Sequence, residues 1–276
     1  MKAVRFHEFG DPGVLRHEDV EQPEPGPGEV RLRVAGSAFN PVDDGIRGGY
    51  LQEPFPVTLP HTPGIEVSGR VDALGEGVDD VAVGDAVIGF LPMVGLTAWQ
   101  ALFDDAGLEA GQRLLINGAG GAVGGYAVQL AKGAGAYVIA TASPRSVARV
   151  RSAGADEVID HTAADVTVAE PVDVLLNLAR IAPEQLAALV ALVRPGGVVV
   201  NTVPTIPTPA DDERGVRGVG FFVRSDTDQL GRLVALVDRG ELRVDVAERV
   251  PLTELPAIHA RAATGDLPGR VVVVPS

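Results

Sequence analysis

Short runs of alternating apolar and polar residues fill much of the first hundred positions of the chain. Residues 30–34 (VRLRV) and 65–71 (IEVSGRV) place apolar side chains at about every second position, as half-buried strands do. A further short strand is expected at residues 86–89. Pro- and Gly-rich stretches at residues 23–27 and 45–49 have turn and loop chemistry. The pattern predicts a small β-rich domain.

From Gly111 onward, short apolar runs alternate with segments whose apolar residues recur at helical spacing. The helix after the first run carries Val123, Ala127, Leu130 and Ala131 on one stripe. Strands that alternate with helices imply a parallel sheet covered on both faces, so we expect an α/β fold with a doubly wound sheet. The predicted strands are residues 113–117, 136–141, 157–160, 172–178, 197–203 and 270–274, and the further helices are residues 146–152, 184–193 and 229–238.

Charge and composition exclude several function classes. The 276 residues include 23 Lys and Arg against 37 Asp and Glu, a net charge of −14 that disfavours nucleic acid as a partner. The chain has no cysteine, which excludes disulfides, thiolate nucleophiles and Cys-based zinc sites. No Gly-x-Ser-x-Gly motif marks a serine hydrolase. The histidines are scattered, so the sequence predicts no catalytic metal; they are His7, His17, His61, His161 and His259.

No run approaches the roughly 18 apolar residues that a membrane helix needs. The N-terminal residues 1–6 begin a strand-like alternation and lack the features of a secretory signal. We therefore expect a soluble, cytoplasmic protein without a membrane partner.

A Gly-rich segment follows the strand predicted at residues 113–117. Glycines in such a turn let a pyrophosphate approach the main chain, and the start of the next helix favours its negative charge. A Gly-rich string by itself often serves only as a turn, but here strand, glycines, helix and second strand come in the order of a dinucleotide site. The expected cofactor contacts in this segment are Gly118, Gly120, Gly121, Ala122, Val123 and Gly124.

The end of the second strand distinguishes between the two nicotinamide cofactors. An NAD site usually has Asp or Glu there, which binds the ribose 2′-hydroxyl. This chain instead has Ser143 and Arg145, which can bind a 2′-phosphate by a hydrogen bond and a bidentate ion pair. Alternatively, Ser143 and Pro144 cap the next helix, and both roles are compatible. The predicted cofactor is NADPH.

The chain resembles the zinc-free quinone oxidoreductases of the medium-chain dehydrogenase/reductase superfamily, the zeta-crystallin-like group. Beside the glycine turn, the matching motifs are Met1-Lys2-Ala3-Val4, residues 24–30 (EPGPGEV), Asn40-Pro41-Val42-Asp43, residues 64–69 (GIEVSG), Gly95-Leu96-Thr97-Ala98-Trp99 and residues 154–160 (GADEVID). The resemblance implies a GroES-like β-rich domain at residues 1–100, completed by residues 241–276. A Rossmann domain would then occupy residues 101–240.

The resemblance also implies roles for individual residues. Asn40, Asp43 and Tyr50 would line the substrate side, and Thr97 would lie near the nicotinamide. Asn177, which follows a sheet strand, would contact the cofactor. Phe221, Phe222 and Val223 would form a late strand that flanks the nicotinamide. Arg270 would replace a Lys that is common near the phosphates. Plain structural alternatives remain, because Asn40-Pro41-Val42-Asp43 is also a good turn sequence and Tyr50 can simply pack its ring.

One feature departs from the family. After residues 88–90 the family has a few dozen residues that form further strands and a helix, whereas here Phe90-Leu91-Pro92 leads directly to Gly95-Leu96-Thr97. Losing paired strands exposes sheet edges and opens the site to water.

The leading hypothesis is NADPH-dependent reduction of a quinone or an α,β-unsaturated carbonyl, in which the nicotinamide supplies the hydride. The alternatives are a non-redox enzyme, such as a cyclase or isomerase, on the same scaffold and a catalytically silent NADPH-binding protein. The resemblance also suggests a homodimer.

Overall fold

The computed structural model describes residues 1–89, 93–267 and 269–275. The chain divides into two compact units, one of Met1–Leu91 with Asp245–Ser276 and the other of Pro92–Val244. Within the described ranges, no helix is both long enough and apolar enough to cross a bilayer. The junction at Phe90, Leu91 and Pro92, where the sequence departs from the family, lies outside the described residues.

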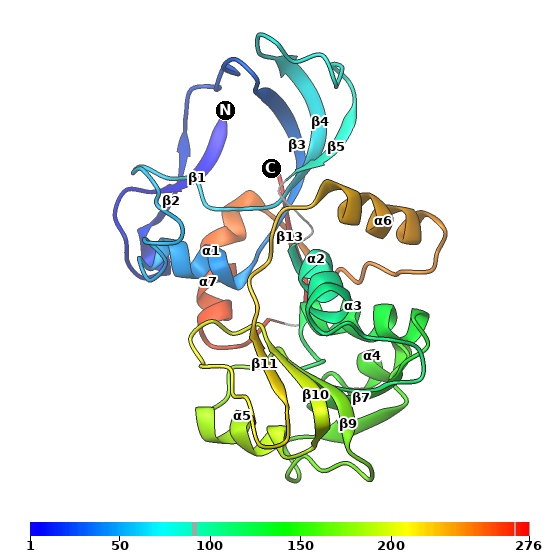
Figure 1. Ribbon diagram of the computed structural model, residues 1–276. Helices are drawn as coiled ribbons and strands as arrows, with labels where there is room; N and C mark the ends of the chain where they lie inside the picture. The colour runs from blue at the N-terminus through cyan, green and yellow to red at the C-terminus, as the bar shows by residue number, and fades with distance from the viewer. Residues whose placement is uncertain (90–92, 268, 276) are drawn as a thin grey trace. The chain divides into compact units, whose positions relative to one another are not determined.

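The unit Pro92–Val244 is built on a six-stranded sheet in which all neighbouring strands are parallel (Figure 1). In spatial order the strands are β11 (Arg217–Gly220), β10 (Val193–Asn201), β9 (Val172–Asn177), β6 (Arg113–Asn117), β7 (Tyr137–Ala142) and β8 (Glu157–Asp160). The first three strands in sequence run outward from β6 to β8, and the chain then returns to the other side of β6. The strand order therefore reverses between β6 and β9, the position at which ligands bind in open α/β sheets.

The helices of this unit precede, join or follow these strands. They are α2 (Met93–Trp99), which continues into the π-helix η2 (Gln100–Asp105), α3 (Ala122–Gly133), α4 (Val147–Ser152), α5 (Pro183–Val190) and α6 (Thr227–Asp238). The apolar stripe of α3 is buried at Ala127, Leu130 and Ala131, as its spacing predicts. The fully buried strand residues Leu115, Ile139 and Leu175 lie in the core on which α5 packs. The predicted α/β fold with a parallel sheet is confirmed.

The other unit combines both ends of the chain in one five-stranded sheet. Its order is β12 (Glu248–Pro251), β13 (Val271–Val274), β3 (Val30–Ala38), β4 (Val67–Leu74) and β5 (Ala86–Gly89). The C-terminal strand β13 pairs antiparallel with β3, with Val273 opposite Ser37. The predicted GroES-like domain is thereby completed from the C-terminal side, and β5 is the outermost strand on its side of the sheet.

Smaller elements close the core of this unit. A two-stranded sheet of β1 (Lys2–Phe6) and β2 (Leu15–Asp19) packs with helices α1 (Pro41–Arg47) and α7 (Leu255–Ala263), and with the 3-10 turns η1 (Pro12–Val14) and η3 (Leu252–Glu254). Phe6, Ile46 and Leu255 meet in the apolar core between them.

The structure corrects the sequence prediction at three segments, in addition to the elements that the prediction missed. Asn40-Pro41-Val42-Asp43 is the start of helix α1, because an N-cap residue followed by Pro and Asp also suits a first helical turn. The helix predicted at residues 184–193 ends at Val190, and β10 begins at Val193 with a register shift before Val198. The strand expected at residues 221–223 ends at Gly220, so Phe221, Phe222 and Val223 follow β11 as a connection without helix or strand.

Candidate functional site

The glycines after β6 have separate geometric roles. Gly118 has a φ of +89°, a conformation that side chains disfavour, and a Cβ there would lie 3.0 Å from the Cβ of Ala179. A Cβ on Gly120 would overlap Ser146 Oγ, and one on Gly124 would overlap the backbone of Ala119. The missing side chains therefore let the turn pack closely against Ala179 and Ser146, and let α3 pack against the backbone of Ala119. Such close packing is typical of a dinucleotide-binding turn.

Helix α3 begins where this turn ends. Gly121 is its N-cap, and Ala122 and Val123 are its first residues. The first N–H groups of a helix have no acceptor within the helix, and its dipole adds partial positive charge there. With 12 residues, α3 presents this charge at the carboxyl edge of the sheet, beside the point where the strand order reverses. The arrangement suits the pyrophosphate of a dinucleotide.

Polar and cationic residues follow β7 at the position that selects the cofactor. Ser143 is half-buried, and its carbonyl oxygen accepts the N–H groups of Ser146 at 2.8 Å and Val147 at 3.1 Å, so it also starts the turn into α4. Arg145 is exposed. The guanidinium of Arg149, one helical turn further on, donates to the carbonyl oxygen of Gly120. Positive charge thus lies at the glycine turn, and the carboxylate typical of an NAD site is missing from the end of β7.

A chain of side-chain hydrogen bonds crosses four neighbouring strands at the same edge. Thr141 Oγ1 donates to Asn117 Oδ1 at 2.9 Å, and Asn117 Nδ2 donates to Asn177 Oδ1 at 2.8 Å. Asn177 Nδ2 donates in turn to Asn201 Oδ1 at 2.9 Å. The N–H of Gly118 donates to Thr141 Oγ1 at 2.8 Å, so the same chain of hydrogen bonds also fixes the start of the glycine turn.

Both polar groups of the Asn177 side chain, Oδ1 and Nδ2, take part in this chain of hydrogen bonds. Asn177 is fully buried, and its backbone oxygen accepts both the N–H and the hydroxyl of Thr202. The geometry therefore favours a supporting role for Asn177 in shaping the edge of the sheet, and its contact with a cofactor stays a prediction.

The residues expected near the nicotinamide lie on two segments of the same unit. Thr97 is buried on α2. The N–H of Phe221 donates to the carbonyl oxygen of Asn201 at 3.0 Å, which extends the pairing of β11 by one residue, and the Phe222 side chain is exposed.

In the other unit, Asn40 and Arg270 are joined in a buried polar cluster. Arg270 Nη1 donates to Asn40 Oδ1 at 2.9 Å, and its Nη2 pairs with Glu66. Asn40 Nδ2 donates to the carbonyl oxygen of Ala38 at 3.1 Å. Both Asn40 and Arg270 are therefore engaged within their own unit, and a phosphate contact of Arg270 remains a prediction of the resemblance.

Asp43 caps α1 from within the helix. Its Oδ2 accepts the N–H of Asn40 at 2.8 Å, and burial raises the pKa of its carboxyl to about 7. His259 on α7 is also fully buried, and burial lowers the pKa of its imidazole to about 4. Arg47 Nε donates to His259 Nδ1 at 3.3 Å, and Asp44 Oδ1 lies 3.4 Å from the same ring nitrogen.

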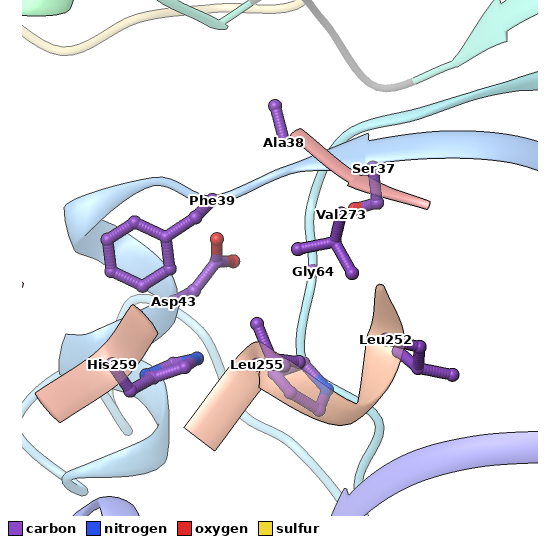
Figure 2. Close-up of a pocket in the computed structure, with 10 residues that line it drawn as sticks. Ser37, Ala38, Phe39, Asp43, Gly64, Leu252, Leu255, His259 and Val273 are labelled. Carbon is purple, nitrogen blue, oxygen red and sulfur yellow. The ribbon is translucent and has the colours of Figure 1, made fainter. Parts of the chain in front are cut away.

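Asp43 and His259 line one small cavity with Phe39, which packs edge-on against the His259 ring (Figure 2). Asp43 Oδ1 and His259 Nε2 are both buried and have no hydrogen-bond partner among the residues described. The cavity measures about 50 Å³, whereas ligand sites are about 300 Å³ or larger. It has room for a few water molecules and not for a quinone.

Tyr50 has a different environment from Asn40 and Asp43. It lies just beyond the end of α1, its N–H donates to the carbonyl oxygen of Gly45 at 3.0 Å, and its side chain is 84% exposed. Of the three residues expected on the substrate side, Tyr50 alone presents its side chain at the surface of its unit.

Two family descriptions match the chain: "Alcohol dehydrogenase GroES-like domain" over residues 26–141 and "Zinc-binding dehydrogenase" over residues 153–273. The chain is 30% identical to the quinone oxidoreductase of Rattus norvegicus, and the alignment covers 94% of this chain and 93% of the rat protein. The chain belongs to the quinone oxidoreductase group of the medium-chain dehydrogenase/reductase superfamily. The family predicted from the sequence motifs is confirmed.

Solved structures of quinone oxidoreductases and related proteins have the same fold. The quinone oxidoreductase from Coxiella burnetii superposes with a TM-score of 0.87 at 28% identity, covering 99% of each chain. A mycobacterial protein solved in complex with NADPH superposes with a TM-score of 0.81 at 25% identity, covering 100% of each chain.

This quinone oxidoreductase relative is shorter than the rat protein inside the matched region. Their alignment extends over 310 positions, whereas the whole chain has 276 residues. At least 310 − 276 = 34 positions of the rat protein therefore have no counterpart in this chain. The length agrees with the few dozen residues that the motifs indicate are missing. Their place after Phe90 remains a prediction.

One family description names zinc, and the described residues offer no donor set for that metal. There is no cysteine, and within residues 1–89, 93–267 and 269–275 no three His, Asp or Glu side chains are grouped as ligands. The described residues do not fit a zinc centre.

Sequence reasoning missed several residues of these sites. Arg149 and Asn201 act through contacts with segments that are distant in sequence. Only the spacing of four residues between Arg145 and Arg149 could have indicated Arg149. The pairing of Arg47 with His259 spans 212 positions and has no local pattern.

Proposed function

We propose that this quinone oxidoreductase relative uses NADPH to reduce a quinone or an α,β-unsaturated carbonyl compound. The observation that carries the proposal is the strand–turn–helix at the reversal point of the parallel sheet, with Ser143 and Arg145 at the position of the usual carboxylate. The mycobacterial relative solved with NADPH supports the same cofactor.

The cofactor would be held by the residues of the glycine turn and of the loop after β7. The turn from Gly118 to Gly121 admits the pyrophosphate, and the N–H groups at the start of α3 donate to it. The Ser143 hydroxyl and the Arg145 guanidinium bind the 2′-phosphate, and Arg149 adds positive charge beside Gly120. Thr97 and the segment of Phe221, Phe222 and Val223 flank the nicotinamide.

NADPH, when bound, supplies a hydride to the electrophilic carbon or oxygen of the substrate, and the accompanying proton comes from solvent. The protein then needs to orient the substrate and exclude water, which explains why no acid–base pair stands out in the sequence. We assign Tyr50 to substrate contact, and Asn40 and Asp43 to holding the start of the helix that precedes it. We also infer that the reaction is independent of zinc and that the enzyme forms a homodimer.

The test is oxidation of NADPH, followed by the loss of nicotinamide absorbance, with a panel of quinones and enones. Parallel titrations measure the Kd of NADPH and of NADH. We expect turnover with NADPH, tighter binding of NADPH than of NADH, and unchanged rates in the presence of a chelator. Sedimentation gives the subunit number, and a strict monomer would remove the homodimer.

The shortened chain makes one other outcome informative. A gap of at least 34 positions relative to the rat protein is large enough to remove part of a substrate-binding region. Tight NADPH binding without oxidation by any electrophile would favour a non-redox cyclase or isomerase, or a silent NADPH-binding protein. Absence of NADPH binding would refute the proposal as a whole.

A further inference from the structure

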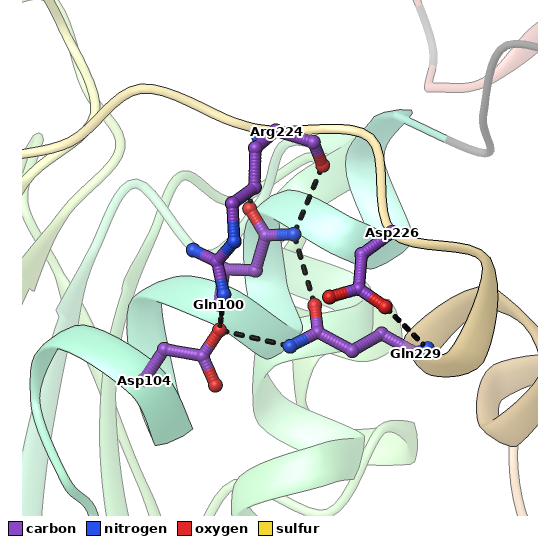
Figure 3. A network of polar contacts seen from close by, with 5 residues as sticks. All are labelled: Gln100, Asp104, Arg224, Asp226 and Gln229. Carbon is purple, nitrogen blue, oxygen red and sulfur yellow. Dashed lines mark hydrogen bonds and ion pairs between the residues drawn. The ribbon is translucent and has the colours of Figure 1, made fainter.

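Gln100 holds the backbone of Arg224 by both of its polar groups (Figure 3). Gln100 is the first residue of η2 and is completely buried. Its Oε1 accepts the N–H of Arg224 at 3.0 Å, and its Nε2 donates to the carbonyl oxygen of Arg224 at 3.0 Å. The amide thus pairs with the main chain as a neighbouring strand would.

A ring of further contacts fixes the direction of this amide. Gln100 Nε2 also donates to Gln229 Oε1 at 2.9 Å, and Gln229 Nε2 donates to Asp104 Oδ2 at 2.9 Å. Asp104 in turn pairs with the guanidinium of Arg224. An amide turned the other way would set its oxygen against two acceptors, so the network permits one orientation.

Gln229 connects this network to the next helix. Its backbone N–H donates to Asp226 Oδ1 at 2.9 Å, which makes Asp226 the N-cap of α6. Residues 221–226 have neither helix nor strand, so side-chain contacts such as these determine their path. At one end Phe221 is held by Asn201, and three residues later Arg224 is held by Gln100. Phe222 and Val223 lie between these two anchors.

We propose that Gln100 is a positioning residue that sets the placement of Phe222 and Val223 against the nicotinamide. Gln100 follows Thr97 by three residues on the continuous helical segment of α2 and η2. One side chain therefore couples the helix of Thr97 to the segment that ends at Arg224. The inference rests on the proposed function, in which both segments flank the nicotinamide. Displacements of about 1 Å in such positions can slow a reaction by about 100-fold.

The first test is the Gln100→Glu variant. A buried carboxylate cannot donate to the carbonyl oxygen of Arg224, whereas a protonated carboxyl group can. We expect kcat to fall about 10- to 100-fold at high pH and to recover as the pH falls, with the Kd of NADPH changed less than about twofold, because the phosphate contacts lie on the glycine turn. Gln100→Met has a similar shape and no donor at any pH, so its kcat should be low throughout.

The chain provides a matched control in Gln129. This residue of α3 holds Arg243 in the same way: its Oε1 accepts the N–H at 2.9 Å and its Nε2 donates to the carbonyl oxygen at 3.2 Å. Arg243 belongs to a segment that has no assigned role in cofactor binding. Gln129→Glu should therefore leave the pH profile of kcat as in the parent protein.

Hydrogen exchange at the Arg224 amide separates failure of this inference from failure of the proposed function. Gln100→Met removes the oxygen that accepts this N–H, so we expect faster exchange at the Arg224 amide in Gln100→Met than in the parent protein. If the parent protein neither binds nor oxidises NADPH, the proposed function fails. The role of Gln100 at the nicotinamide then fails too, even if hydrogen exchange confirms that Gln100 is hydrogen-bonded to the backbone of Arg224. If the parent is active, a kcat of either Gln100 variant within about twofold of the parent at all pH values would overturn the inference.

Discussion

Arg270 Nη1 donates to Asn40 Oδ1 at 2.9 Å, across 230 positions of the sequence. The same guanidinium pairs with Glu66, and all three side chains are buried. Arg270 directly precedes the C-terminal strand β13, and Asn40 lies two residues beyond β3, the strand that pairs with β13 in the sheet. The contact therefore helps to join the two ends of the chain into one unit.

Removing one partner of this cluster should destabilise the protein strongly. Arg270→Met removes the guanidinium that pairs with the buried Glu66 carboxylate, and we expect a loss of about 3–5 kcal/mol in the free energy of unfolding. Arg270→Met combined with Glu66→Met should be less destabilised than Arg270→Met alone, because no buried charge is left unpaired. Urea unfolding measures both. Arg16→Met, at an exposed position of β2, should change stability by less than about 0.5 kcal/mol.

Asp43 and His259 should give opposite pH dependences of stability. The raised pKa of Asp43, about 7 against 3.8, means that the native state keeps a proton which the unfolded state has lost. Stability from this group therefore falls by about 4 kcal/mol as the pH rises from about 4 to about 7. The lowered pKa of His259, about 4 against 6.5, makes stability rise by about 3 kcal/mol as the pH rises from about 4 to 6.5.

In the parent protein these two contributions largely cancel between pH 4 and 6.5. Asp43→Asn should leave the rise due to His259, and His259→Gln should leave the fall due to Asp43. The measurement is the difference in urea midpoint between variant and parent at each pH, in which the titration of all other carboxyl groups cancels. Differences that stay constant with pH would contradict the assigned pKa shifts.

Two neighbouring glycines of α3 should respond oppositely to alanine. A Cβ on Gly124 would overlap the backbone of Ala119, so Gly124→Ala should cost about 1–3 kcal/mol and weaken NADPH binding by moving α3 away from the turn. Apart from its two chain neighbours and the backbone of its own helix, no described atom lies within 4 Å of a Cβ on Gly125, so Gly125→Ala should stabilise the helix by about 0.5–1 kcal/mol. Thermal unfolding measures the stability of each variant, and titration with NADPH measures its Kd. Equal effects of the two changes would show that close packing at Gly124 is unimportant.

Arg145 should distinguish NADPH from NADH. Under the proposed function, Arg145 forms a charge-assisted pair with the 2′-phosphate. We therefore expect Arg145→Ala to raise the Kd of NADPH about 10- to 100-fold and to change that of NADH less than about twofold. Fluorescence titration with each cofactor measures this. Arg151→Ala, an exposed arginine at the end of α4, is the control and should change neither value. Equal weakening of both cofactors by Arg145→Ala would place the 2′-phosphate elsewhere.

Local patterns predicted most of the parallel sheet because its strands are apolar and separated by clear helical spacing. In that sheet, β6 and β8 have the bounds that the sequence indicates, and so does β5 in the sheet of the other unit. Elements with weak periodicity were missed. The strand β2, Leu15-Arg16-His17-Glu18-Asp19, is mostly polar and exists through its pairing with β1. Helix α7 is likewise held by its packing on α1.

The sequence by itself determined the glycine turn, the absence of a carboxylate after β7 and the alternation of strands and helices, because these depend on residues that are close neighbours in the chain. Only the tertiary structure decided which polar side chains meet. Gln100 reaches Arg224 across 124 positions, and Asn117 reaches Asn177 across 60. Such pairs carry no periodic signal, since a buried amide is placed by whichever backbone or side chain the completed fold brings within hydrogen-bond distance.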